Sequence, residues 1–175
     1  MHYNLQCNDN FFLLHLDLLL KQKNLPEFNE ITSRIKINIH LSKKKINLNF
    51  DSLEETINLP VNFNLIFNSL LNKLSQTYIS FNEIIFFPFR GEVKFGQKKT
   101  ILRNNHSLIF QELIRAKDTG IKKTNLYSII WPNDYNIQIN KLDTHLTNLK
   151  NFLKSEINYE LNYLSQSGII KINSN

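Results

Sequence analysis

Segment 138–154 constrains the fold of this chain most, because its apolar residues recur at steps of three and four. These residues are Ile139, Leu142, Leu146, Leu149 and Leu153. At about 100° per residue they share one side of a helix, and that side must face a core. The opposite side collects Asn140, Lys141, Thr144, Thr147, Asn148 and Asn151, with Asp143, His145 and Lys150 at its flanks. The pattern predicts a helix that is anchored by one face and presents short polar side chains on the other.

Two shorter helices are expected before this one. The first should run from about Asn105 to Lys117, with Asn104 or Asn105 as its N-cap. The second should begin after Lys123, with Thr124 as N-cap, and end at Trp131, because the following Pro132 cannot continue a helix.

Short apolar and alternating runs predict two small antiparallel elements, one on each side of the helices. The first element consists of strands Tyr78–Phe81, Ile84–Phe87, Glu92–Phe95 and Thr100–Ile101, with Pro88, Gly91 and Gly96 in the turns. The second is a hairpin of Glu160–Leu164 and Ile169–Ile172 around residues 165–168.

The order of residues in Ile121–Trp131 and Lys141–Lys150 resembles the C-terminal DNA-binding domain of OmpR/PhoB-type response regulators. That family reads roughly V-S-R-E-x-L-L-x-x-V-W, a loop, then V-D-x-H-I-x-x-L-R. Matching positions hold Ile121, Leu126, Ile130, Trp131, Leu142, Asp143, His145, Leu146 and Leu149, and Lys150 stands where the family has arginine. The chain departs from the family at Arg103 and His106, where a Thr and a Glu are usual.

The resemblance implies an α+β protein whose residues 77–175 form a winged helix: a small antiparallel sheet, three helices and a C-terminal β-hairpin. It implies a bacterial transcription regulator related to two-component systems, with segment 138–154 reading double-stranded DNA. Trp131 is then expected in the core beneath that helix, where truncation to Ala would cost about 3–5 kcal/mol. The loop Pro132–Ile137 touches RNA polymerase in some members of the family.

Charge and side-chain chemistry fit a nucleic-acid partner. Of the net charge of +6, nearly all lies in residues 77–175, which hold thirteen Lys/Arg against eight Asp/Glu. Asn pairs well with the edge of adenine, whereas Lys suits phosphates. The candidate DNA-binding residues are Asn140, Lys141, Thr144, His145, Thr147, Asn148, Lys150, Asn151, Lys154, Lys171, Lys122 and Lys123.

Residues 1–76 form a small α/β part that is too short for a receiver domain of about 120 residues. An amphipathic helix is expected after Pro60, over 61–74, with Leu65, Phe67, Leu70, Leu71 and Leu74 as its apolar side. Asp9 is the only acid near the first strand end, where a receiver needs a pair to hold Mg²⁺. Asp51 is the nearest candidate phosphoacceptor, although a solvated turn residue is the better interpretation. This part is interpreted as a degenerate receiver-like or dimerisation region that works without phosphorylation.

Other functions are weakly indicated. The single Cys7 excludes an internal disulfide and suits a reducing cytoplasm. Phe11–Leu20 is too short and too interrupted for a signal peptide or a membrane span. The segment Gly96–Thr100 is interpreted as a strand turn rather than a phosphate-binding loop, and the five scattered histidines suggest no metal site. Neither an enzyme nor a cofactor is expected. The partners expected of a DNA-binding regulator include a second copy of the chain, in a homodimer. The alternatives to such a regulator are a winged helix that binds a protein and a replication-initiator-like winged helix.

Overall fold

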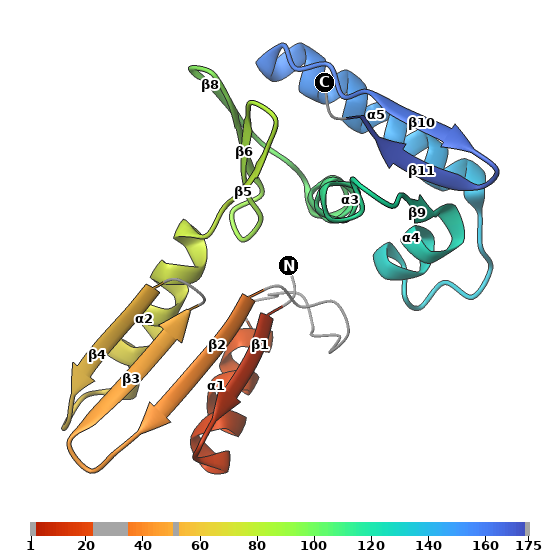
Figure 1. The fold of residues 1–175 in the computed structure, drawn as a ribbon. Coiled ribbons are helices and arrows are strands. Elements are labelled where there is room, and N and C mark those ends of the chain that lie inside the picture. Colours follow the sequence, from red (N-terminus) through yellow and green to blue (C-terminus); the bar gives the residue numbers. More distant parts are fainter. Residues whose placement is uncertain (1–2, 23–34, 51–52, 174–175) are drawn as a thin grey trace. The chain divides into compact units, whose positions relative to one another are not determined.

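The computed structural model describes residues 3–22, 35–50 and 53–173, and it divides the chain into two compact units (Figure 1). Unit 1 is Met1–Gln76 and unit 2 is Thr77–Asn175. The boundary lies at the position expected from the sequence. Asp51, the candidate phosphoacceptor, lies outside the described residues.

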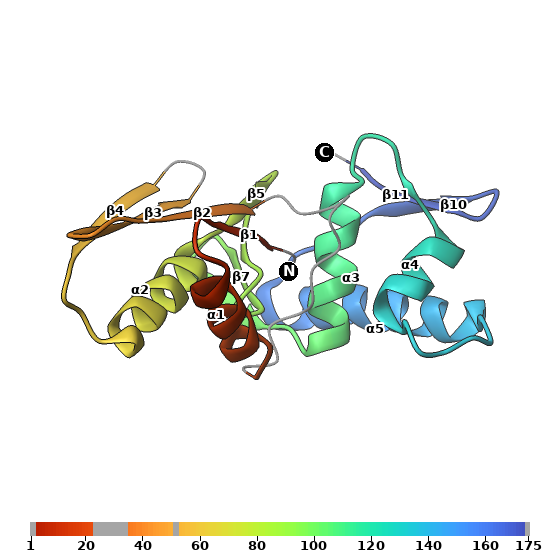
Figure 2. The same ribbon diagram turned by 90° about the horizontal axis from the view of Figure 1, so that it is seen from below.

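Unit 1 is a four-stranded sheet with two helices on one face (Figure 2). Its elements are β1 (Tyr3–Cys7), α1 (Asn10–Gln22), β2 (Ile35–Leu41), β3 (Lys45–Phe50), β4 (Leu53–Asn58) and α2 (Phe63–Gln76). The strand order is β1-β2-β3-β4. Only β1 and β2 are parallel, whereas the other neighbouring strands are antiparallel.

Buried and more exposed residues alternate along β2 and β3, so one face of this sheet is apolar and is covered by the two helices. Ile37 and Ile39 of β2 are buried, and Ile39 lies opposite the buried Leu48 of β3. The helices contribute Leu16, Leu20, Ile66, Phe67, Leu70 and Leu74 to the buried set. The expectation for Leu65 was wrong, since this side chain is 61% exposed. Ile66 takes its place because it continues the i, i+4, i+8 stripe through Leu70 and Leu74.

The topology of unit 1 limits its likeness to a receiver. A receiver sheet is parallel, with strand order 2-1-3-4-5 and helices on both faces. Here only β1, α1 and β2 follow that scheme. Asp9 also has a structural role, because its Oδ1 accepts a hydrogen bond from Phe12 N at 2.8 Å. This is the N-cap interaction of α1.

Unit 2 has an α+β architecture of two small sheets and three helices. Its elements are β5 (Ile79–Phe81), β6 (Ile84–Phe87), β7 (Glu92–Phe95), β8 (Lys98–Ile101), α3 (Asn104–Arg115), β9 (Ile121–Lys122), α4 (Lys123–Ile130), α5 (Ile139–Ile157), β10 (Tyr163–Gln166) and β11 (Ile169–Ile172). One sheet is β5-β6-β7-β8 and the other is β10-β11-β9. The segment around Gly96 is the turn between β7 and β8, as expected.

The ends of the helices differ from the expected ones. Arg103 is the N-cap of α3 and Lys122 that of α4, and neither makes a side-chain cap hydrogen bond. The start of α4 is held by the backbone instead, since Lys123 N donates to the Gly168 carbonyl at 2.8 Å. Helix α5 extends to Ile157 and ends at Asn158, whose φ of 61° is the left-handed conformation typical of a helix end.

In the core of unit 2, Tyr127 is the fully buried aromatic residue of α4, whereas Trp131, which was expected in the core, is not fully buried. Tyr127 is fully buried, together with Phe86, Phe110 and the apolar stripe of α5. Trp131 is half-buried at the edge of the core, with its ring centroid 4.6 Å from that of Tyr127. The reason is local: α4 ends at Ile130, and Trp131 is its C-cap with φ −126° and ψ 70°. The cost of truncating Trp131 should therefore lie below the 3–5 kcal/mol expected for a buried ring.

Candidate nucleic-acid interface

The outward face of α5 carries five of the six polar side chains that the sequence predicts there, the exception being Lys141. The buried side consists of Leu142, Leu146, Leu149, Leu153 and Ile157. The exposed residues are Asn140, Thr144, Thr147, Asn148 and Asn151. The two threonine hydroxyls donate to the carbonyls of Asn140 and Asp143 at 2.9 Å. Within the described part of the chain, no hydrogen bond occupies the side-chain amides of the three asparagines.

Lys141 lies away from this outward face and holds the loop before α5. Its Nζ is 3.2 Å from Asp134 Oδ2 and 4.4 Å from the centroid of the Trp131 ring. Tyr127 Oη donates to the same carboxylate oxygen at 2.5 Å. The hydrogen bond from Tyr127 and then that from Lys141 lower the pKa of Asp134, although partial burial opposes the shift. Lys141 thus neutralises an acid and orders a loop.

This cluster makes stability depend on acid pH. Because the folded pKa of Asp134 lies below its ordinary value of 3.8, the cluster stabilises unit 2 fully above about pH 5 and loses its effect as pH falls through that lowered pKa. We expect Asp134→Asn to reduce the difference between the urea midpoints at about pH 6 and pH 2.5. Asp118→Asn, which removes an exposed carboxylate after α3, is the matched control. Equal midpoint differences in both variants and the wild type would contradict this role.

Two further predicted lysines are paired with acids. Lys123 Nζ lies 2.7 Å from Asp143 Oδ1 and so ties the start of α4 to α5. Lys154 Nζ lies 3.7 Å from Glu160 Oε1, in a pair that is mostly exposed. An exposed pair adds little stability and exchanges readily with solvent. Lys123 is therefore engaged more firmly than Lys154.

The pairing of β9 with β11 brings Lys122 and Lys171 to one surface. Lys122 lies opposite Ile169, two residues before Lys171 on β11, so both lysines project from the same face of the three-stranded sheet. Both are exposed. The tip of the hairpin is a two-residue turn of Ser167 and Gly168, whose φ angles of 51° and 75° suit a type I′ turn. Together with half-buried Lys150, they are the candidate lysines that make no ion pair within the described residues.

His145 is not on the outward face either. Its ring packs between those of Trp131 and His106, at centroid distances of 5.2 and 5.7 Å. Its Nδ1 is buried and has no hydrogen-bond partner among the described residues.

Arg103 and His106 border the candidate interface, although the sequence marked them only as departures from the family pattern. The replacement of the family's Thr and Glu by these two basic residues was the one sequence signal that could have pointed to them.

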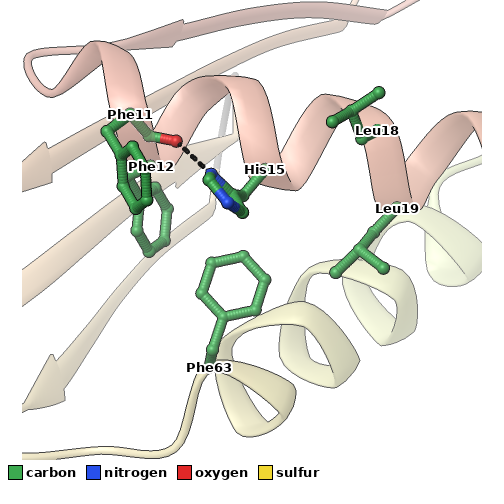
Figure 3. A pocket seen from close by; sticks show the side chains of 6 residues that line it. All are labelled: Phe11, Phe12, His15, Leu18, Leu19 and Phe63. Carbon is green, nitrogen blue, oxygen red and sulfur yellow. Dashed lines mark hydrogen bonds between the residues drawn. The ribbon is translucent and has the colours of Figure 1, made fainter.

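Unit 1 has an apolar groove of about 360 Å³ on α1 and α2 (Figure 3). It is lined by Phe11, Phe12, His15, Leu18, Leu19 and Phe63. His15 Nδ1 donates to the Phe11 carbonyl at 2.8 Å. The Phe12 and Phe63 rings pack edge to face, with their centroids 5.1 Å apart. No lining residue is acidic, so the groove differs chemically from a Mg²⁺-binding receiver site. The homodimer expected from the sequence stays a prediction.

No group of three or more His, Cys, Asp and Glu side chains among the described residues lies close enough to hold a metal ion. None of the helices described combines the length and the apolar character that crossing a bilayer requires.

Comparisons with known proteins show a shared fold. No protein-family model matches the sequence, and no curated protein matches it either. The DNA-binding domain of CadC from E. coli superposes with a TM-score of 0.50 at 10% identity, over 58% of this chain and 95% of that one. A protein described as a streptococcal redox sensor, of a family evolved from two-component response regulators, gives a TM-score of 0.45 at 10% identity, over 99% of this chain and 67% of that one. The chain therefore contains the fold of the CadC DNA-binding domain.

Proposed function

We propose that the chain is a DNA-binding transcriptional regulator of the response-regulator winged-helix type, in which α5 reads the major groove and the β10–β11 hairpin is the wing. The proposal rests on the separation of α5 into a buried apolar side and an exposed polar side. Its apolar side is buried in the core. On its exposed side the Asn amides make no hydrogen bond within the described residues, and the Thr hydroxyls, which donate to backbone carbonyls, keep their oxygens available as acceptors. A recognition helix needs this division, because its outer side chains must exchange water for base edges.

The fold shared with the CadC DNA-binding domain supports this proposal. Lys122, Lys150 and Lys171 are assigned to phosphates, as is Lys154 if its exposed pair with Glu160 opens. Lys123, Lys141 and His145 are assigned to positioning α4, α5 and the connecting loop, since their contacts within unit 2 already engage them. No catalytic role is proposed.

Regulation is proposed to be independent of phosphorylation. Asp9, the acid nearest the end of β1, caps α1, and the sheet of unit 1 is antiparallel beyond β2. Acetyl phosphate with Mg²⁺ should therefore leave both the mass and the DNA affinity of the protein unchanged. An acid-labile adduct on any aspartate would overturn this part of the proposal.

The outward residues of α5 should set sequence preference separately from affinity. After selection of a preferred site from a random pool, Asn148→Ala or Asn140→Ala should relax discrimination at one or two base pairs, by about 1–3 kcal/mol each. Lys150→Ala should weaken binding to all sequences about equally, because a phosphate contact carries no base information. Competition binding with single-base variants of the site measures both effects. If all three variants lose affinity uniformly, α5 is not the reading helix.

A second candidate function is a winged helix that binds a protein. It is favoured by exposed apolar side chains on the connecting loop and the hairpin, where Tyr135 is 94% and Leu164 is 60% exposed. Failure of the wild-type protein to bind any duplex at low salt would move this candidate to the lead. Tyr135→Ser and Leu164→Ser would then be the first variants to test against partner proteins.

A further inference from the structure

A groove between the start of α3 and the middle of α5 is lined entirely by basic and amide residues. They are Arg103, Asn104, Asn105, His106, His145 and Asn148, and the groove has a volume of about 590 Å³. Asn148 belongs at the same time to the outward face of α5. The groove therefore opens directly beside the residues proposed to contact bases.

The groove gathers positive charge that no lining acid compensates. Arg103 is exposed and makes no ion pair within the described residues. The half-buried His106 ring lies 5.7 Å from that of His145, centroid to centroid, and 6.5 Å from the Phe152 ring. Burial lowers the pKa of His106, and the charges of His145 and Arg103 lower it further. An anion in the groove would relieve this repulsion.

We propose that a phosphodiester group of the DNA backbone binds in this groove, held by Arg103 and His106 next to the bases that Asn148 contacts. This inference rests on the proposed function. The guanidinium offers paired N–H donors that match two phosphate oxygens, and the protonated imidazole donates a further hydrogen bond. No described side chain caps the first turn of α3, whose backbone N–H groups add partial positive charge.

The sign of the pH dependence follows from the same contacts. A bound phosphate raises the pKa of His106 from its lowered value, so the complex takes up a proton that the free protein lacks. Affinity should then rise as pH falls through the pKa of the complex, and level off below that of the free protein. The charged groups that face His106 are His145 and Arg103, which lower its pKa, and the phosphate, which raises it.

The test is fluorescence anisotropy of the full chain on a random-sequence duplex over a salt series. Arg103→Gln should lower the slope of log affinity against log salt by about 0.9, and lower affinity about tenfold at 50 mM salt. Arg103→Lys should keep the slope. Lys117→Gln, an exposed cation about 18 Å away past the other end of α3, is the control and should keep both values. His106→Gln should flatten the pH dependence between about pH 8 and pH 5.5.

The outcomes separate this inference from the proposed function. Wild-type protein that does not bind the duplex at low salt would overturn both. Wild-type binding with an unchanged slope in Arg103→Gln would overturn the groove assignment alone. In a third experiment the protein is titrated with inorganic phosphate, and the NMR chemical shifts of the His106 ring report binding. Saturable shifts at millimolar phosphate, with no slope change on DNA, would assign the groove to a small free anion and overturn the phosphodiester.

Discussion

DNA affinity should fall about 150-fold between 50 and 200 mM salt, which is the largest effect that we expect. Each neutralised phosphate contributes a slope of about 0.9 in log affinity against log salt. Lys122, Lys150 and Lys171 make no ion pair within the described residues, and the Arg103 groove adds a fourth contact. Four contacts give a slope of about 3.6. The measurement is anisotropy on a random-sequence duplex, which isolates the contribution of the backbone.

The slope also tests the assignment of the paired lysines. If Lys123, Lys141 and Lys154 gave up their acids to bind phosphates, the slope would approach about 6.3 for seven contacts. Lys122→Gln should lower the slope by about 0.9, whereas Lys43→Gln, an exposed cation in unit 1, should leave it unchanged. A flat response in the wild type would count against DNA binding altogether.

Leu149→Ala should destabilise unit 2 by about 2–5 kcal/mol. Leu149 is fully buried in the stripe by which α5 packs on the core, so the truncation leaves a cavity that the surrounding helices fill only partly. Trp131 is the single tryptophan of the chain and lies in unit 2, so its fluorescence reports on this unit in a urea titration.

The matched control is the neighbouring residue on the outward face. Asn148→Ala removes a side chain of similar size from the exposed side of the same turn, and should change stability by no more than about 0.5 kcal/mol. The pair therefore separates the anchoring face of α5 from its reading face. Similar losses of stability in both variants would mean that α5 is not oriented as described.

Local patterns were sufficient to predict most elements of unit 2. The spacing of apolar residues in 138–154 determines a helix and its buried side, because only one face of a helix can meet the core. The four short strands and the presence of the hairpin likewise follow from alternating runs bounded by turn residues. The first strand of the hairpin was placed too early, since β10 runs to Gln166 rather than ending at Leu164. The main errors were at helix ends. The start of α4, for example, is satisfied by a hydrogen bond to the Gly168 carbonyl, about forty-five residues away along the chain.

The sequence by itself thus determined the row of Asn and Thr that faces outward on α5, since helical periodicity alone places those residues opposite the apolar stripe. It misplaced Lys141, which turns to Asp134 and Trp131. Only the tertiary structure decided which of the candidate cations remain available. Lys123 and Lys141 look equivalent to Lys122 and Lys150 in the sequence, yet Asp143 and Asp134 engage the first two. Long-range pairing also made unit 1 mostly antiparallel, put Lys122 beside Lys171, and brought Arg103 and His106 to Asn148. These placements depend on contacts between distant segments, which no local pattern encodes.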